Sequence, residues 1–518
     1  MITGQVSRTA SLVVLGLVLA FGLGVLFGPS VRPASGGPGT SAPSQAANAP
    51  ADEASPAPID YVGEFALTPS EGPIGSLVRA QGSGFDANAS LRLVWQAFRG
   101  AWKTDDTPQN FKGREYQEDL LPLGEVQTDA DGRFSTSFTV PDGFGFAHDV
   151  RVIQDDVVRN QSSFSVEMRV SVTPKSGPIG TPITIDVEGI GITPLTHSWL
   201  LTYDNRFTGW LSAVTTEGRA RAVIPATGSV GPHVLKILHG SFTFPYMNPQ
   251  QSPEPDRPTF TEMFTITEGP PVLPTAAAEQ WDPVVAGSAP SDVDGAVIWT
   301  DPVEGQPGTR TMLRGSGLPP GAVLSVGWLT QVAGASYDGG LMISGEGDNR
   351  PKADWELGTV TTDSSGTLEW EFEVPIDKGG WHEITLAHGD DVAAATGYRV
   401  RPVAAEITPT SGPVGTVITL NISGVDDTDT GKIYMTVYDN GLLGYSCSVT
   451  GQGQITINLP AAGDPGWHFI DLYPGIYKGE DLKSAYNYRI PQLTYADDHP
   501  GEVLPAFRFA YEVTEPAN

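Results

Sequence analysis

The sequence predicts an all-β protein composed of four tandem β-sandwich domains. Of its 518 residues, 61 are glycine and 44 are proline, which suits many short strands and is too many for a helical protein. Short runs of alternating apolar residues recur between these breakers, without helical periodicity. The third observation is an internal duplication, in which a unit of two domains is written twice.

The first element is an apolar stretch, residues 10–27, which carries no charge. As a helix it would extend about 27 Å, close to the ~30 Å hydrocarbon core of a bilayer. It is longer than the core of an ordinary secretion signal, and no small-x-small cleavage site follows closely. The sequence therefore favours a single-pass membrane anchor at 1–28, with a cleaved signal as the alternative. Arg8 on the short side predicts that the rest of the chain is extracytoplasmic.

The next segment, residues 29–59, is rich in Pro, Ala, Ser and Gly and has almost no large apolar side chains. It cannot bury enough surface to fold, so we expect a disordered tether. Such a tether would hold the following domains away from the membrane.

The rest of the chain repeats at a spacing of about 235 residues. The Tyr-Asp-Asn turn at 203–205 recurs at 438–440, and Trp95 recurs as Trp328. Four domains of about 105 residues, the size of one β-sandwich, therefore follow each other. Their expected ranges are A1 60–168, B1 169–268, A2 296–402 and B2 403–518, with a flexible linker at 269–295. No breaker separates A1 from B1, and A2 meets B2 almost as tightly, which predicts two stiff pairs joined by that linker.

Each domain carries the same series of strands. Alternating positions predict one face toward the core, as in Ile183, Ile185 and Val187 of B1 and their counterparts Ile418, Leu420 and Ile422 of B2. In the A domains a similar run ends on a tryptophan, Trp95 or Trp328, which we expect to be buried.

The domain openings resemble a known family. Residues 68–75, 173–180 and 408–415 read TPSEGPIG, TPKSGPIG and TPTSGPVG, and the A domains continue to GSGF or GSGL. These motifs are similar to the IPT/TIG group of bacterial immunoglobulin-like domains, although B1 and B2 replace the second motif. The resemblance implies four tandem immunoglobulin-like β-sandwiches in an exported or cell-surface protein, with binding or spacer roles. It implies no activity, since the motifs are turn and core residues.

Composition excludes several classes of function. The 60 acidic and 30 basic side chains give a net charge of −30, which would repel the phosphate backbone of a nucleic acid. The single cysteine, Cys447, excludes a disulfide framework and a Cys-based zinc site. No glycine-rich phosphate loop is present, and no cofactor is expected.

Two groups of polar residues are candidate sites. Four histidines share one repeat position, which indicates a structural corner and not catalysis: His148, His233, His382 and His468. The acidic loop with Asp426, Asp427 and Asp429 is the candidate for calcium. Counted from Asp427, however, its twelfth position is Tyr438, where an EF-hand needs Glu. No metal site is therefore predicted, and no catalytic residue is assigned.

Long segments that differ between the copies are the candidates for binding. They cover 96–125, 329–358, 241–263 and 475–506 and are rich in aromatic residues with polar neighbours, which suit a cell-surface protein or a glycan. The residues expected to meet such a partner are Trp102, Tyr116, Tyr246, Tyr337, Trp355, Tyr486 and Tyr488. The alternative is that these loops only cover sheet edges.

The sequence thus predicts a non-catalytic, extracytoplasmic, membrane-anchored surface protein for adhesion, ligand binding or spacing. The alternative is a secreted hydrolase or a carbohydrate-active accessory protein with an unrecognised site. An enzyme would have convergent groups with perturbed pKa values in a pocket of one domain only.

Overall fold

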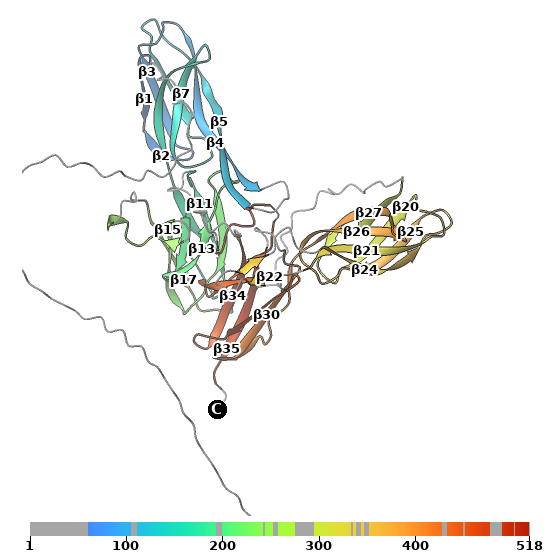
Figure 1. Cartoon of the computed structure of the whole chain (residues 1–518). Helices are drawn as coiled ribbons and strands as arrows, with labels where there is room; N and C mark the ends of the chain where they lie inside the picture. The colour runs from blue at the N-terminus through green and yellow to red at the C-terminus, as the bar shows by residue number, and fades with distance from the viewer. Residues whose placement is uncertain are drawn as a thin grey trace, which may run out of the picture. The chain divides into compact units, whose positions relative to one another are not determined.

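The computed structural model describes residues 61–104, 111–192, 199–241, 244–251, 257–274, 295–332, 335–337, 343–345, 352–426, 432–448, 451–476, 489–501 and 503–516. These residues form strands and connecting turns, with one short 3₁₀ turn, η1 (Pro249–Gln251). The strands build paired sheets, which are visible in Figure 1. The fold is the expected all-β series of immunoglobulin-like sandwiches.

Domain A1 contains a three-stranded and a five-stranded sheet. The smaller sheet has the order β1 (Glu64–Thr68), β3 (Leu77–Ser83), β6 (Phe134–Thr139). The larger sheet has the order β2 (Glu71–Pro73), β8 (Val157–Glu167), β7 (Phe146–Gln154), β4 (Ser90–Thr104), β5 (Phe111–Gln127).

Domain B1 repeats this order. Its smaller sheet consists of β14 (Ala220–Pro225), β11 (Pro182–Glu188) and β9 (Arg169–Thr173). Its larger sheet runs β10 (Ser176–Gly177), β17 (Phe260–Ile266), β15 (Gly231–Ser241), β12 (Trp199–Tyr203), β13 (Arg206–Leu211), and β16 (Phe244–Pro245) pairs with β15.

Domain A2 again has two sheets, and a small hairpin besides. The smaller sheet runs β18 (Val297–Asp301), β20 (Arg310–Ser316), β25 (Leu368–Glu373). The larger runs β19 (Glu304–Gly305), β27 (Asp391–Val400), β26 (Gly380–His388), β21 (Val323–Gln331), β24 (Lys352–Thr361). The hairpin pairs β22 (Ala335–Tyr337) with β23 (Ile343–Gly345).

Domain B2 completes the series. Its smaller sheet runs β28 (Val403–Ala404), β30 (Val417–Ser423), β33 (Ile455–Pro460). Its larger sheet runs β29 (Ser411–Pro413), β35 (Phe507–Thr514), β34 (Gly466–Gly475), β31 (Ile433–Tyr438), β32 (Gly441–Cys447). In every domain a cis peptide bond precedes a proline in the opening motif: Pro69, Pro174, Pro302 and Pro409.

The predicted inward faces are confirmed. Ile183 and Ile185 are fully buried in B1, as are Ile418 and Leu420 in B2. The two repeat tryptophans are also buried in the cores of the A domains, where Trp95 is 2% exposed and Trp328 is 0% exposed. The alternation of apolar residues is sufficient to predict this burial, because every second side chain of a strand lies on the same face of the sheet.

The expectation of a long loop after Trp95 is wrong. Strands β4 and β5 stay paired from Ser90↔Gln127 to Thr104↔Phe111, so residues 96–104 and 111–125 belong to a long hairpin. Part of its far end, with Phe111 and Trp102, packs in an apolar cluster with Trp210 of B1 and Ile490 of B2. The hairpin is therefore a contact between domains, which the sequence of A1 alone could not indicate.

Candidate binding cleft between the B domains

The four repeat histidines occupy equivalent corners. Each ring stacks on an aromatic ring of a neighbouring strand, with centroids 4.6 to 5.6 Å apart. Each Nε2 lies 2.7 to 2.9 Å from the carbonyl oxygen four residues earlier. Because the same geometry recurs in four separate cores, the role of these histidines is structural: each packs on an aromatic ring and binds the backbone.

The partner of Nδ1 distinguishes the A domains from the B domains. In A1 and A2 the hydrogen-bond acceptor is a backbone carbonyl oxygen, 2.7 Å from His148 and 3.1 Å from His382. In A2, Oδ2 of Asp377 also lies 3.4 Å from Nδ1 of His382. In B1 and B2 the acceptor is a carboxylate, and Asp204 and Asp439 each lie 2.6 Å from the histidine of their domain. A carboxylate favours the charged imidazolium, whereas a carbonyl does so more weakly.

This difference changes the pKa values. Burial lowers the pKa of His148 and of His382 below the ordinary 6.5. Burial also opposes the charge on His468, but the hydrogen bond and charge of Asp439 outweigh it, so the pKa of His468 is raised. The same corner is therefore electrostatically opposite in A2 and B2.

We expect opposite pH effects on the stability of the A domains and of B2. When pH falls below 6.5, the unfolded A domains bind protons at His148 and His382 more readily than the folded ones, so their stability falls. The stabilisation from protonated His468 is present below 6.5 and is lost as pH rises through its higher folded pKa. Imidazole NMR titration of the folded chain checks this order. Titration of His468 below His148 would contradict it.

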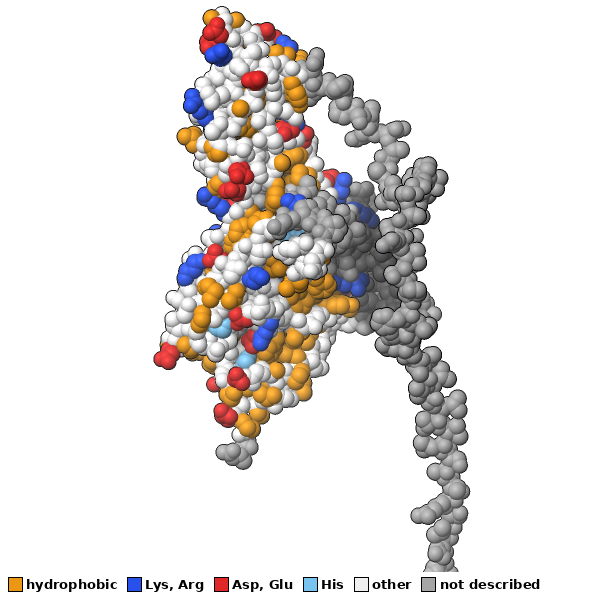
Figure 2. All heavy atoms as spheres, turned by 90° about the vertical axis from the view of Figure 1, so that its left-hand side faces the viewer, with side chains coloured by type: hydrophobic (Ala, Val, Ile, Leu, Met, Phe, Trp, Pro, Cys, Tyr) orange, Lys and Arg blue, Asp and Glu red, His pale blue; other side chains and the backbone are white. Residues whose placement is uncertain are grey.

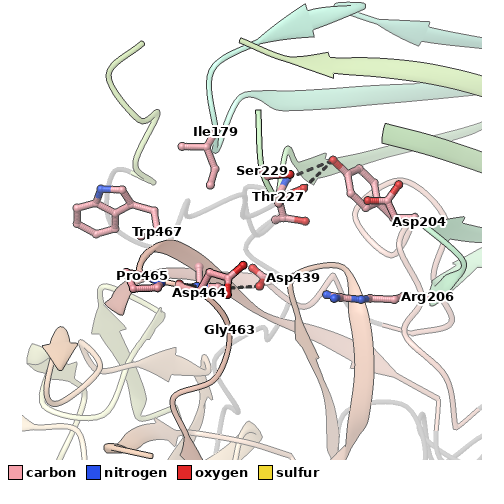
Figure 3. Close-up of a pocket in the computed structure, with 14 residues that line it drawn as sticks. Ile179, Asp204, Arg206, Thr227, Ser229, Asp439, Gly463, Asp464, Pro465 and Trp467 are labelled. Atoms are coloured by element: carbon pink, nitrogen blue, oxygen red, sulfur yellow. Dashed lines mark hydrogen bonds and ion pairs between the residues drawn. The ribbon is translucent and has the colours of Figure 1, made fainter. Parts of the chain in front are cut away.

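A cavity of about 280 Å³ lies between B1 and B2, near the lower end of the range for small-ligand sites. Figure 3 shows its lining, with Ile179, Thr227, Ser229 and Asp204 of B1 in the upper part and Asp439, Gly463 and Asp464 of B2 below them. The side chains that matter to its chemistry are Ile179, Asp204 and Arg206 of B1 and Asp439, Asp464 and Trp467 of B2. These side chains supply an indole ring, an aliphatic group, three carboxylates and one guanidinium group, and Tyr203 and His468 add two further rings to the lining.

Two of these carboxylates are fixed by equivalent turns. Asp204 and Asp439 have φ angles of 47° and 46°, a left-handed conformation that Asp tolerates. The second oxygen of each accepts a backbone N–H of the next strand, from Val234 at 2.9 Å and Phe469 at 3.0 Å. Both carboxylates are therefore held as hydrogen-bond acceptors at the rim of the cleft.

Arg206 lies against a glycine of B2 at the edge of the cleft. The position equivalent to Arg206 is Gly441 in B2. A Cβ on Gly441 would lie 3.3 Å from Cδ of Arg206, which is tighter than an ordinary contact. The glycine thus leaves room for the arginine stem along the edge of the cleft.

The Tyr-Asp-Asn turn of B2 contacts B1 beside the cleft. The side chain of Asn440 is buried in B1, where its Nδ2 donates to the carbonyl oxygen of Pro225 at 2.8 Å and to Oγ1 of Thr227 at 3.0 Å. The Thr208 hydroxyl donates to the Asn440 carbonyl at 2.7 Å. Asn205, the repeat counterpart in B1, is exposed.

Replacing Asn440 with alanine should loosen the B1–B2 contact by about 2–3 kcal/mol, since two buried acceptors lose their donor. Asn205→Ala is the matched control. Both asparagines have left-handed φ angles, 59° and 63°, so the backbone cost is the same. Hydrogen exchange along β13 and β32 measures the difference. Equal protection in both variants would mean that the turn does not hold the domains together.

Two predicted binding residues of A1 contact other parts of the chain. The indole N–H of Trp102 donates to Oδ1 of Asp498 at 2.8 Å, and its ring centroid lies 6.1 Å from that of Trp210. The ring of Tyr116 packs edge-on against Phe144 at 5.4 Å.

The remaining predicted residues do not meet on one described surface. Trp355 is partly buried against the A2 core, and the backbone N–H of Tyr246 donates to His239. Tyr337 lies in β22, whose side chains are not described, and Tyr486 and Tyr488 lie outside the described residues. A shared role for the seven residues in binding stays a prediction.

Asp498 is the centre of the contact that Trp102 makes. This carboxylate of B2 is fully buried and accepts the backbone N–H groups of Val214 and Thr215 of B1 at 2.8 and 2.9 Å. The hydroxyl of Thr215 donates to it as well, at 2.8 Å. One carboxylate therefore ties A1, B1 and B2 together.

Sequence reasoning missed Trp467, Asn440 and Asp498. Trp467 precedes a repeat histidine, and Asn440 lies in the repeated Tyr-Asp-Asn turn. The repeat therefore marks both positions, but it does not indicate what the residues do. Asp498 lies in the segment 475–506, which differs in sequence from its equivalent in B1, so the repeat does not single this residue out. The exposed Cys447 stands at the repeat position of the buried Ser212.

Metal and membrane predictions fall largely outside the structure. Of the calcium candidates, Asp426 is described, whereas Asp427 and Asp429 are not. Within the described ranges there is no group of three or more His, Cys, Asp or Glu side chains that could hold a metal ion. Those ranges also contain no helix long and apolar enough to cross a membrane, and the anchor at 1–28 and the tether at 29–59 lie outside them.

Comparisons with known proteins give only distant likenesses. No family model matches the sequence, and no curated protein is significantly similar to it. Salmonella alpha-2-macroglobulin aligns over 88% of this chain and 31% of its own, at 13% identity and a TM-score of 0.18. Invasin, a bacterial integrin-binding protein, aligns over 87% and 79%, at 10% identity and 0.18. This chain therefore spans about a third of the macroglobulin, and at such TM-scores neither likeness carries an argument.

Proposed function

We propose that the protein is a non-catalytic, extracytoplasmic surface protein of IPT/TIG-like modules that binds a neutral glycan between B1 and B2. The carrying observation is the lining of the cleft, where Trp467 and Ile179 lie beside carboxylates and Arg206 (Figure 3). Sugar rings combine an apolar face with hydroxyl groups, which suits an aromatic platform with polar neighbours. The apolar segment 10–27 supports a location outside the cytoplasm.

The charges of the cleft favour a neutral ligand over an anionic one. Three carboxylates face one guanidinium group and the imidazole of His468, and the whole chain carries −30. Asp204 and Asp439 already bind a histidine and a backbone N–H, so they suit the acceptance of further hydroxyl donors. The face in Figure 2 carries scattered single charges and no large basic patch.

A panel of neutral and sialylated glycans tests this with the full chain. Trp467→Ala should weaken binding of a neutral glycan about tenfold or more, the equivalent of ~1.4 kcal/mol. Trp299→Ala is the control, because Trp299 is 39% exposed on β18 and does not line the cleft. Unchanged binding by the Trp467 variant, or binding only of sialylated glycans or of a cell-surface protein, would contradict the proposal.

A further inference from the structure

The outer edge of the larger B1 sheet is covered by a segment of B2. At this edge, the N–H of Trp210 on β13 donates to the carbonyl oxygen of Pro491 at 2.7 Å, and the N–H of Leu493 donates to the carbonyl oxygen of Trp210 at 2.9 Å. Gly209 permits the approach, since a Cβ there would lie 2.6 Å from the Pro491 oxygen. Residues 490–494, the covering segment, thus extend the B1 sheet by a short parallel bridge.

B1 carries a counterpart of the covering segment. Residues 244–248 read Phe-Pro-Tyr-Met-Asn, and 490–494 read Ile-Pro-Gln-Leu-Thr. Each segment is fastened to its own domain by the same bond: Tyr246 N–H to His239 at 3.4 Å in B1, and Gln492 N–H to Pro474 at 3.3 Å in B2. The two acceptors are 235 positions apart, which is the spacing of the B repeat.

The two segments differ sharply in exposure. The apolar side chains of the covering segment are buried, with Ile490 at 1% and Leu493 at 7%. Their counterparts in B1 face solvent, with Phe244 at 59% and Met247 at 76% exposed. Residues 244–248 therefore have the form of a covering segment without an edge to cover.

In B2, the part of the equivalent edge around Gly444 has no cover among the residues that the structure describes. Strand β32 ends its sheet as β13 does, and Gly444 stands where Gly209 stands in B1. A Cβ on Gly444 would meet nothing within 4 Å, and its neighbours Leu443 and Tyr445 are 60% and 50% exposed. Such an edge with exposed apolar side chains is a surface for strand addition.

The Tyr-Asp-Asn turns of the two B domains differ in exposure in the same way as the two segments. Asn440 of B2 is buried against Pro225 of B1, whereas Asn205 of B1 and Pro460, the counterpart of Pro225, are both exposed. The Tyr-Asp-Asn turn, the covering segment and the edge strand thus each occur in both B domains. Among the residues that the structure describes, the turn and the segment that are buried against the other B domain are those of B2, and the edge that is covered is that of B1.

We propose that the second set pairs between two copies of this chain. Residues 244–248 of one copy cover β32 of the next, with Met247 over Gly444 and Asn205 against Pro460. The internal B1–B2 contact is head-to-tail, because one domain gives the segment and the other gives the edge. Repeating such a contact from copy to copy produces an open linear assembly.

Cysteine cross-linking of the full chain in its membrane tests the geometry. Oγ of Ser212 lies 2.8 Å from Oγ1 of Thr494 in the internal contact. Their counterparts are Cys447, which is exposed, and Asn248. Asn248→Cys should give a ladder of disulfide-linked dimers, trimers and longer species under mild oxidation. Val157→Cys, a change at an exposed site in A1, is the control for random collision. A ladder no faster than in that control would overturn the proposal.

Association measured by ultracentrifugation of the detergent-extracted full chain tests the apolar contact separately. Met247→Asp should weaken self-association at least tenfold, because it places a charge against an apolar edge. Met263→Asp is the matched control, at a methionine of the same domain that is 45% exposed and lies outside the segment. A monomer at all concentrations, or equal association by both variants, would refute the pairing. Neither outcome bears on glycan binding in the internal cleft.

Discussion

Replacing Trp328 with alanine should destabilise A2 by about 3–5 kcal/mol through the cavity alone. Its ring is fully buried and stacks on His382 with the centroids 4.6 Å apart. The indole N–H also donates to Oδ2 of Asp377 at 2.8 Å, and Asp377 is fully buried. Loss of this donor should add about 1–2 kcal/mol. Oδ1 of Asp377 accepts Gln452 of B2 at 2.6 Å, so the damage should spread to the A2–B2 contact.

Trp95→Ala in A1 separates these two contributions. Trp95 has the same place in the repeat, and the counterpart of Asp377, 234 positions earlier, is Gly143. This variant should therefore show the cost of the cavity without that of the carboxylate. Native-state hydrogen exchange resolved by peptide reports each domain separately, which a single melting curve of four domains would not. A loss of less than about 1 kcal/mol in either domain would contradict the core assignment.

Replacing Asp498 with alanine should release the β4–β5 hairpin from B1 and B2 and cost about 3–5 kcal/mol. The change leaves the N–H groups of Val214, Thr215 and Trp102 without their acceptor, at ~1–3 kcal/mol for each one that stays buried. The measurement is hydrogen exchange and limited proteolysis in residues 96–104 and 111–125.

Asp497→Ala is the control for this second prediction. Asp497 is the exposed neighbour of the buried Asp498, so its loss removes the same charge from the surface without touching the contact. Hairpin protection that is equally retained in both variants would show that apolar packing around Trp102 and Trp210 holds the hairpin by itself.

The sequence by itself determined the sandwich cores and their repetition. Alternation at Ile183 and Ile185 or at Ile418 and Leu420 names the buried face, because strand geometry sends successive side chains to opposite sides. The recurrence of a histidine in four domains likewise identified a structural corner before any contact was known. These are local or periodic features, so they can be read from the order of residues.

Only the tertiary structure decided how the domains use their surfaces. Asn205 and Asn440 lie in the same Tyr-Asp-Asn turn, yet one is exposed and the other is buried in a neighbouring domain. The indole N–H of Trp102, a residue that the sequence predicts to meet a partner, donates to Asp498, which lies 396 positions away in sequence. Contacts of this kind depend on where whole domains are placed, and that placement arises from many distant side chains together, so no local pattern encodes it.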